Sequence, residues 1–314
     1  MRPHLRSFAN RQAGVFTCAQ ARLCGYAEAE IQRLVRSGAW VRVRRGAYIE
    51  RKAWAAADAD ERHLLKARAV LLALADGSVL SHDTAALVHG LPNWGLDLRQ
   101  VRVTRPMLRT PRHQAGVGHH VATLPDAHTT VAGLPVTTPV RTALDVARAR
   151  GFEAGLVCAD AVLHAGANAT ELRQVAALMR EWPGASASTA VAGAADGRTE
   201  SPGETLTRIM LQSMGLVVEP QVDLPAAGAR VDFRLRDYRV VVEFDGRAKY
   251  ATAQGVADVR VLWDEKRRED RIRELGYVVV RITWADLFGP QRAVTERRVR
   301  AAIALASRLG RVTA

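Results

Sequence analysis

One stretch, residues 229–246, constrains the fold more than any other part of the chain. Its first half, residues 231–236, alternates apolar and charged side chains, which is the period of a half-buried β-strand. A second alternating run covers residues 240–245, after Asp237-Tyr238. Two such runs around a short loop predict a β-hairpin in which Phe233 lies opposite Val242.

With that register, Asp232 lies across from Glu243, and Asp245 follows two residues along on the same face. Like charges placed opposite each other repel, so a sheet built only for stability would avoid this pairing. Three converging carboxylates form a hard-oxygen site suited to Mg²⁺ or Mn²⁺. The alternative is that these side chains are solvated, or paired with the many nearby arginines.

The flanking residues predict helices and a further strand. Residues 200–204, Glu-Ser-Pro-Gly-Glu, open an amphipathic helix, with Ser201 at the N-cap and Glu204 at the third position of a capping box. Glu204 is therefore either a cap or a catalytic residue. Residues 263–276 predict a charged helix that ends at a glycine, and residues 277–283 a buried strand.

This order of elements resembles the PD-(D/E)xK nuclease superfamily, in particular the small domains similar to the very-short-patch-repair endonuclease. The resemblance covers roughly residues 197 to 290. It implies a restriction-endonuclease-like α/β domain with a central mixed sheet, and Mg²⁺-dependent hydrolysis of phosphodiester bonds in DNA. The matching segments are Glu200 and Glu204, residues 231–233, residues 243–246, residues 266–270 and residues 280–284.

The resemblance also implies roles for individual residues. Asp232 and Glu243 would hold the cation, with Asp245 as a further ligand, direct or through water. One departure concerns the third position of the E-x-K element, where Asp245 replaces the lysine that helps to activate water. Lys249 and Lys266 are the nearest substitutes; the alternative for each is a solvated surface lysine.

The charge of the chain indicates a polyanionic partner. The 314 residues carry a formal net charge of +13. Residues 1–52 contain eleven Lys or Arg and three acidic residues, a net of +8 (11 − 3). Their pattern predicts a winged helix-turn-helix, with three helices and then two strands that turn at Arg45-Gly46. The predicted segments are helices at 8–13, 18–24 (capped by Thr17) and 27–37, and strands within 41–49.

In such a fold the third helix enters the major groove of DNA while the wing contacts phosphates or an adjacent groove. The outward-facing residues of the helix are Gln32, Arg33 and Arg36, and the basic residues of the wing are Arg42, Arg44 and Arg45. The alternative is a winged helix that binds protein. This segment resembles the winged-helix domain of AbiEi-family antitoxins, known from bacterial abortive-infection systems.

The AbiEi likeness extends over roughly residues 8 to 180 and includes two predicted capped helices, at 81–90 and from Thr138 to Asp145. A longer helix is predicted at 55–75 and a strand at 101–105. Arg141 and Asp145 are four residues apart and are expected to pair. The histidines at 82, 89, 119 and 120 lack accompanying metal ligands and are interpreted as structural or surface residues.

The predicted fold class is therefore a multidomain α/β protein. Its domains are a winged helix-turn-helix (1–54), a mixed α/β middle region (55–192) and the nuclease-like domain (197–314). Small residues around 183–197 predict a domain boundary or hinge before the last domain. A basic amphipathic helix at 291–309 is expected to pack on it.

Two functional classes compete. The first is a DNA endonuclease acting in repair or phage defence. The second is a non-catalytic, antitoxin-like DNA-binding transcriptional regulator, with a toxin or defence protein as its partner. An RNA substrate is a weaker alternative, because a groove-reading winged helix favours DNA. The sequence shows no membrane-spanning run and no signal peptide, so a cytoplasmic location and reduced cysteines are expected.

Overall fold

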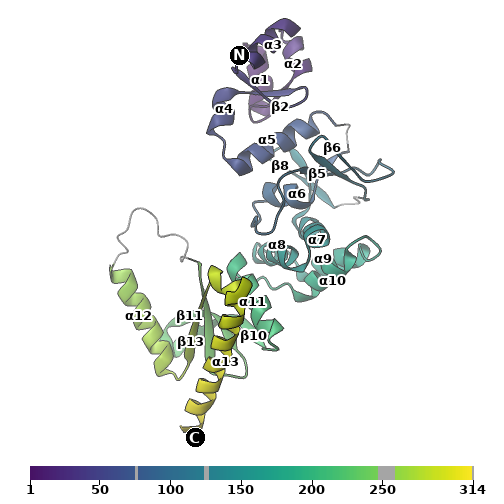
Figure 1. Ribbon diagram of the computed structural model, residues 1–314. Helices are drawn as coiled ribbons and strands as arrows, with labels where there is room; N and C mark the ends of the chain where they lie inside the picture. The colour runs from purple at the N-terminus through teal and green to yellow at the C-terminus, as the bar shows by residue number, and fades with distance from the viewer. Residues whose placement is uncertain (75–76, 124–126, 247–258, 313–314) are drawn as a thin grey trace. The chain divides into compact units, whose positions relative to one another are not determined.

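The computed structural model describes residues 1–74, 77–123, 127–246 and 259–312 (Figure 1). The chain forms two compact units. Unit 1 contains residues 1–158 and 169–193, and unit 2 contains residues 159–168 and 194–314. The predicted winged helix (1–54) lies in unit 1, and the predicted C-terminal domain (197–314) lies within unit 2. The predicted middle region (55–192) is divided, because its residues 159–168 belong to unit 2.

The N-terminal part of unit 1 has three helices and a wing, as predicted, but the first helix starts at Pro3 instead of residue 8 and ends at Arg11. The helices are α1 (Pro3–Arg11), α2 (Cys18–Leu23) and α3 (Glu28–Arg36). The strands β1 (Phe16–Thr17), β2 (Trp40–Arg44) and β3 (Ala47–Glu50) form a sheet in the order β1-β3-β2. Thr17 caps α2, as predicted, and forms a capping box with Gln20. Phe16, Ile31 and Trp40 are buried together at the centre of this fold.

A break separates the next two helices, α4 (Arg51–Ala56) and α5 (Ala59–Leu71). The prediction of one helix from 55 to 75 was wrong at its start. Asp58 forms a capping box with Glu61, so a new helix begins there. Ala69 of α5 then packs with Ile49 of the wing in a shared apolar cluster.

The middle region contains a six-stranded mixed sheet in the order β6-β7-β5-β4-β9-β8. Its strands are β4 (Val79–Leu80), β5 (Val101–Thr104), β6 (Arg112–Gln114), β7 (Val117–His120), β8 (His128–Val131) and β9 (Leu134–Thr137). The predicted helices appear as α6 (His82–Val88) and α7 (Pro139–Arg150). Thr138 caps α7 through its hydroxyl, whereas the hydroxyl of Ser81 lies 2.9 Å from the His82 ring instead of capping α6.

Three further helices follow: α8 (Phe152–His164), α9 (Ala169–Leu178) and α10 (Ala185–Ala194). The small-residue segment that predicted a hinge is mostly the helix α10, in which Ser188 and Val191 are fully buried. Alanines favour a helix, and their short side chains allow close packing. The division between the two units nevertheless falls at its end, between residues 193 and 194.

Unit 2 is built on a four-stranded mixed sheet in the order β10-β11-β12-β13. The strands are β10 (Val218–Leu224), β11 (Ala229–Leu235), β12 (Val240–Asp245) and β13 (Val278–Thr283). The helices are α11 (Pro202–Ser213), α12 (Val259–Glu274) and α13 (Gly289–Val312), with short 3₁₀ turns at Pro225–Ala227 (η1) and Trp284–Leu287 (η3). The predicted order of helix, hairpin, helix and strand is confirmed at this level.

Helices lie on both sides of this sheet (Figure 1). Ile272 of α12 packs against Val241 on one face. On the other face, Gly203 at the start of α11 lies against the ring of Phe244, and a Cβ at position 203 would overlap that ring. The predicted C-terminal helix, α13, packs against β13 and η3.

Candidate functional site

The predicted hairpin register is confirmed. Phe233 lies opposite Val242 and Leu235 opposite Val240, and all four side chains are fully buried. β12 then pairs in parallel with β13, so the second hairpin strand lies inside the sheet. This arrangement brings Asp232 and Glu243 to the end of the sheet from which the chain leaves β12.

A cavity of about 220 Å³ lies at this end of the sheet. It brings together the three carboxylates that the sequence singled out, Asp232, Glu243 and Asp245. Its remaining lining residues are Phe244, Gly246, Glu265, Arg268 and Arg281. The cavity is therefore polar, with acidic residues from the hairpin and arginines from α12 and β13.

Asp232 is a perturbed carboxylate. One of its oxygens accepts a hydrogen bond of 2.7 Å from the backbone N–H of Phe244, which ties β11 to β12. Burial, with a smaller effect from the nearby carboxylates of Glu204 and Glu243, raises the pKa of Asp232 to about 6, although the hydrogen bond from Phe244 opposes this rise. The site therefore concentrates negative charge in a partly desolvated place.

Glu243 is held by arginines. The Nη2 of Arg268 lies 2.7 Å from Glu243 Oε1 and also donates to the backbone carbonyl of Arg230 at 2.6 Å. The Nε of Arg281 lies 3.9 Å from Glu243 Oε2. Burial raises the pKa of Glu243 above its ordinary value, although the two guanidinium groups oppose this rise.

Arg268 was not among the predicted site residues. Its position on α12 carries a signal, however, because it precedes the buried Ile272 by four residues. Residues four apart share a helix face, so Arg268 faces the sheet with Ile272. The apolar stripe of the helix could have identified it.

Glu204 acts as a cap at the start of α11. Its carboxylate accepts hydrogen bonds from the hydroxyl of Ser201 at 2.7 Å, the backbone N–H of Glu200 at 3.0 Å and the side-chain amide of Gln221 at 2.9 Å. Glu204 is almost fully buried and does not line the cavity. The capping alternative therefore describes what this side chain does in the structure.

Of the two lysines proposed to replace the E-x-K lysine, only Lys266 lies among the described residues. Lys266 is exposed on α12, with its Nζ 5.9 Å from the centre of the Trp263 ring, and it does not line the cavity. Lys249 lies outside the described residues. Among the residues that line the cavity, the cationic groups are those of Arg268 and Arg281.

The donor set fits a hard divalent cation in its chemistry, since Asp232 and Glu243 supply carboxylate oxygens from adjacent strands. Burial is the main cause of the raised pKa of Asp232, so this carboxylate is a partly desolvated oxygen donor. Within the described ranges, no group of three or more His, Cys, Asp or Glu side chains is arranged to hold an ion. Because Arg268 already contacts the Glu243 carboxylate, this carboxylate would have to give up that contact in order to bind a cation.

The predicted DNA-contacting residues occupy a second candidate site, on the winged helix. Gln32, Arg33 and Arg36 are exposed on α3, and Arg42 and Arg45 are exposed in the wing. Arg44 differs: it is partly buried, burial lowers its pKa, and its Nη1 has no hydrogen-bond partner among the described residues. The exposed members of this set form the more accessible basic surface.

Two histidines of the middle region, His82 and His120, belong to a largely buried polar cluster. The rings of His82 and His120 stack with their centres 3.8 Å apart, and burial lowers the pKa of each to about 3. The predicted pair of Arg141 and Asp145 forms at 2.9 Å, but both side chains are buried rather than exposed. These contacts join α6, α7 and β7 in unit 1.

Comparison with known proteins identifies the N-terminal segment. Residues 5–50 match a protein-family model, AbiEi_4, described as "Transcriptional regulator, AbiEi antitoxin". This match covers the helices and wing described above, so this winged-helix-like segment is similar to the AbiEi-type regulators that the model describes.

Two curated relatives from Mycobacterium tuberculosis are each 31% identical to this chain over 163 residues. They carry the names "Uncharacterized protein MT2308" (strain CDC 1551 / Oshkosh) and "Uncharacterized protein Rv2248" (strain ATCC 25618 / H37Rv). The match covers 50% of this chain and 58% of each relative. Separately, none of the helices in the described part of the chain has the length and apolar character needed to span a bilayer.

Proposed function

We propose that this chain is a DNA-binding protein whose C-terminal unit hydrolyses phosphodiester bonds with the help of a divalent cation, Mg²⁺ or Mn²⁺. The observation that carries the catalytic part is the meeting of Asp232 and Glu243, from adjacent strands, in one cavity with Asp245. The AbiEi-type segment at residues 5–50 supports the DNA-binding part. A DNA substrate is consistent with action in the cytoplasm.

In this proposal the winged helix selects or tethers the substrate. The exposed Gln32, Arg33 and Arg36 of α3 enter the major groove, and the exposed arginines of the wing contact phosphates. Phosphate contacts fix the register of the protein on the duplex, and contacts to base edges supply specificity. Arg44 contributes less than Arg42 and Arg45, because it is partly buried.

The cleavage site uses residues of the cavity. Asp232 and Glu243 hold the cation, and the amide of Phe244 fixes the Asp232 carboxylate in place. When bound, the cation polarises the scissile phosphate and lowers the pKa of a coordinated water. Arg268, released from Glu243, offsets negative charge on the phosphate, which is the task that a lysine at position 245 would perform. Lys249 and Lys266 are alternative sources of this charge.

A second candidate function is a non-catalytic, antitoxin-like transcriptional regulator that acts with a toxin or defence protein. The AbiEi-type match and the ion pair that Arg268 forms with Glu243 both favour it. In this alternative the ion pair is a structural contact and the C-terminal unit binds another protein. Asp245 in place of the lysine points the same way.

The two candidates differ in a cleavage assay. The full chain is incubated with single-stranded, nicked and duplex DNA, and with RNA, in the presence of Mg²⁺ or Mn²⁺ or of a chelator. We expect metal-dependent cutting of DNA that Asp232→Asn and Glu243→Gln each abolish, and that Asp223→Asn, at an exposed position of β10, retains. Equal cutting by all variants, or none by the wild type while DNA binding persists, would leave the regulator as the better account.

A further inference from the structure

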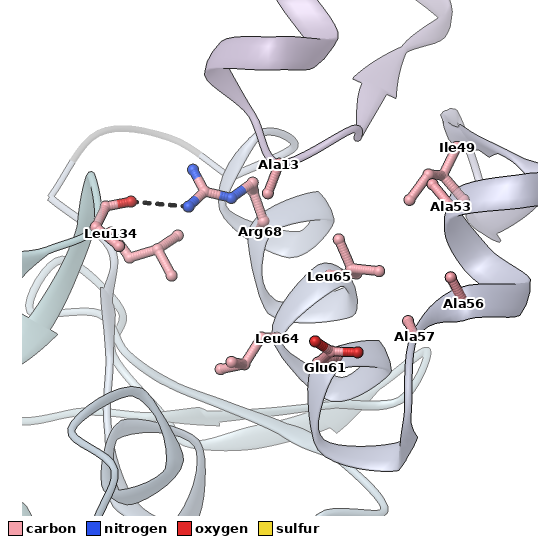
Figure 2. Close-up of a pocket in the computed structure, with 11 residues that line it drawn as sticks. Ala13, Ile49, Ala53, Ala56, Ala57, Glu61, Leu64, Leu65, Arg68 and Leu134 are labelled. Carbon is pink, nitrogen blue, oxygen red and sulfur yellow. Dashed lines mark hydrogen bonds between the residues drawn. The ribbon is translucent and has the colours of Figure 1, made fainter.

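A second cavity, of about 460 Å³, lies in unit 1 between the winged-helix elements and α5 (Figure 2). Its volume is in the range of pockets that enclose small organic molecules, roughly 300–1,000 Å³. Its lining is largely apolar, with two charged residues, and comprises Ala13, Ile49, Ala53, Ala56, Ala57, Glu61, Leu64, Leu65, Arg68, Ala132 and Leu134.

The walls of this cavity come from separate parts of unit 1. Figure 2 shows Leu65 of α5 pointing toward the side on which Ile49 and Ala53 lie, and Leu64 pointing toward the side of Leu134. Alanines form much of the remaining wall, and their short side chains leave the space open. An occupant would therefore bury apolar surface against both the winged helix and α5.

Arg68 is the cationic residue of the cavity lining, and its positive charge is poorly compensated by the groups around it. Its Nη2 donates a hydrogen bond of 2.8 Å to the backbone carbonyl of Ala132, a neutral acceptor. Burial lowers the pKa of Arg68, and in the described part of the chain no carboxylate lies within ion-pair distance of it. A partly desolvated guanidinium without an anion gains from a carboxylate that approaches it with good geometry.

Glu61, the anionic member, is already engaged. Its carboxylate accepts the backbone N–H of Asp58 at 2.9 Å as part of the capping box of α5, and its side chain is exposed. It therefore gives little attraction for a buried cation. The cavity consequently favours an anionic group at Arg68 and an apolar body along the leucines.

We propose that this cavity binds a small monocarboxylate with an aliphatic or aromatic body. Its carboxylate pairs with Arg68, and its apolar part lies against Ile49, Leu64 and Leu65. A charge-assisted pair at Arg68 provides selectivity for the acid over a neutral compound of the same length. This ligand site is independent of the cleavage proposed for unit 2.

The test uses the full chain and two probes of equal length, octanoate and octan-1-ol, in isothermal titration calorimetry. We expect saturable binding of octanoate with one site per chain. Arg68→Met should weaken octanoate binding by about tenfold or more, and should leave octan-1-ol binding within about twofold. Lys66→Met, which removes the same charge from an exposed position of α5, should change neither.

A cavity-filling variant tests the location. Ala53 lines the cavity and is exposed, so Ala53→Trp should fill the space without unfolding the chain, which thermal denaturation checks. This variant should bind octanoate and octan-1-ol each about tenfold or more weakly than the wild type does. The proposal is overturned if octanoate does not saturate, if Arg68→Met and Lys66→Met have equal effects, or if folded Ala53→Trp binds octanoate like the wild type.

Discussion

The guanidinium of Arg268 lies 2.7 Å from the carboxylate of Glu243, and both side chains line the cavity that also contains Asp232. Arg268 comes from α12 and Glu243 from β12, the strand that precedes this helix in the chain. The arginine thereby supplies positive charge where the proposed function requires a cation. In the proposed function, the guanidinium of Arg268 and the divalent cation would compete for the carboxylate of Glu243.

Removing the arginine should strengthen cation binding. In the variant Arg268→Met, Glu243 no longer has an ion pair to break, and one positive charge leaves the cavity. We expect the dissociation constant for Mn²⁺ to fall by about tenfold, since a coupling of roughly 1.4 kcal/mol is modest for a partly buried pair. Isothermal titration calorimetry measures this. Arg267→Met, an exposed neighbour outside the cavity lining, is the matched control, and equal effects of the two variants would argue against the competition.

The stability of unit 2 should depend on pH through Asp232. Its folded-state pKa of about 6 lies above the ordinary value of 3.8. The folded state therefore binds the proton more tightly, and its stability falls as pH rises from about 4 to about 6. Asp232→Asn removes this loss, so it should stabilise unit 2 at pH 8 by roughly 1–3 kcal/mol and give no gain below pH 4.

Differential scanning calorimetry at several pH values, without divalent metal, follows this effect. Asp223→Asn, at an exposed strand position, serves as the control and should show little pH-dependent difference. A gain that is the same at pH 4 and pH 8 would show that the buried charge of Asp232 is not its cause.

A buried ion pair should be essential for unit 2. Arg208 of α11 lies 2.6 Å from Asp160 of α8, and Asp160 also accepts the hydroxyl of Thr205 at 2.8 Å. Because both charges are shielded from water, Asp160→Asn should cost about 3–5 kcal/mol of unfolding free energy. Glu219→Gln, which breaks more exposed pairs with Arg234 and Arg236, should cost about 1 kcal/mol or less.

Chemical denaturation of the full chain, followed by a probe in unit 2, compares these two variants. Arg208→Met combined with Asp160→Leu should recover part of the loss, because it removes both buried charges. If Asp160→Asn unfolds at the same denaturant concentration as Glu219→Gln, the ion pair of Arg208 with Asp160 does not stabilise unit 2 more than the exposed pairs do.

DNA binding should depend on α3. Arg33→Ala and Arg36→Ala remove exposed guanidinium groups, so each should weaken duplex binding and lower the salt dependence of the affinity by about one charge. Fluorescence anisotropy at several salt concentrations measures both quantities. Arg173→Ala, at an exposed site on α9, changes the net charge equally and should leave the affinity almost unchanged. Equal losses for all three variants would indicate a general charge effect.

The features that could be predicted from the sequence are those specified locally. The cap at Thr17, the cap at Ser201 and the hairpin register depend on residues close together in the chain, and all three are present. Alternating side chains define a strand face, and a one-residue slip would expose Phe233. Local patterns therefore sufficed for the winged helix and the hairpin of unit 2, whereas the strands β4 and β6–β10 and the helices α8–α10 were not predicted.

The contacts that escaped prediction join distant residues. Neither the pairing of Arg268 with Glu243 nor that of Arg208 with Asp160 has a local signature, because many arginines compete for each carboxylate. The helix α10 was interpreted as a hinge because small residues favour both loops and close packing, and only burial of Val191 distinguishes them. The engagement of Glu204 by Gln221 likewise depends on where β10 folds back.

Diffraction from crystals soaked in Mn²⁺ shows whether Asp232 and Glu243 hold a divalent cation. We expect an anomalous peak between the two carboxylates, with the Arg268 guanidinium moved away from Glu243, and no such peak in Asp232→Asn crystals. A cavity without anomalous signal at saturating Mn²⁺, in which Arg268 still contacts Glu243, would contradict this expectation.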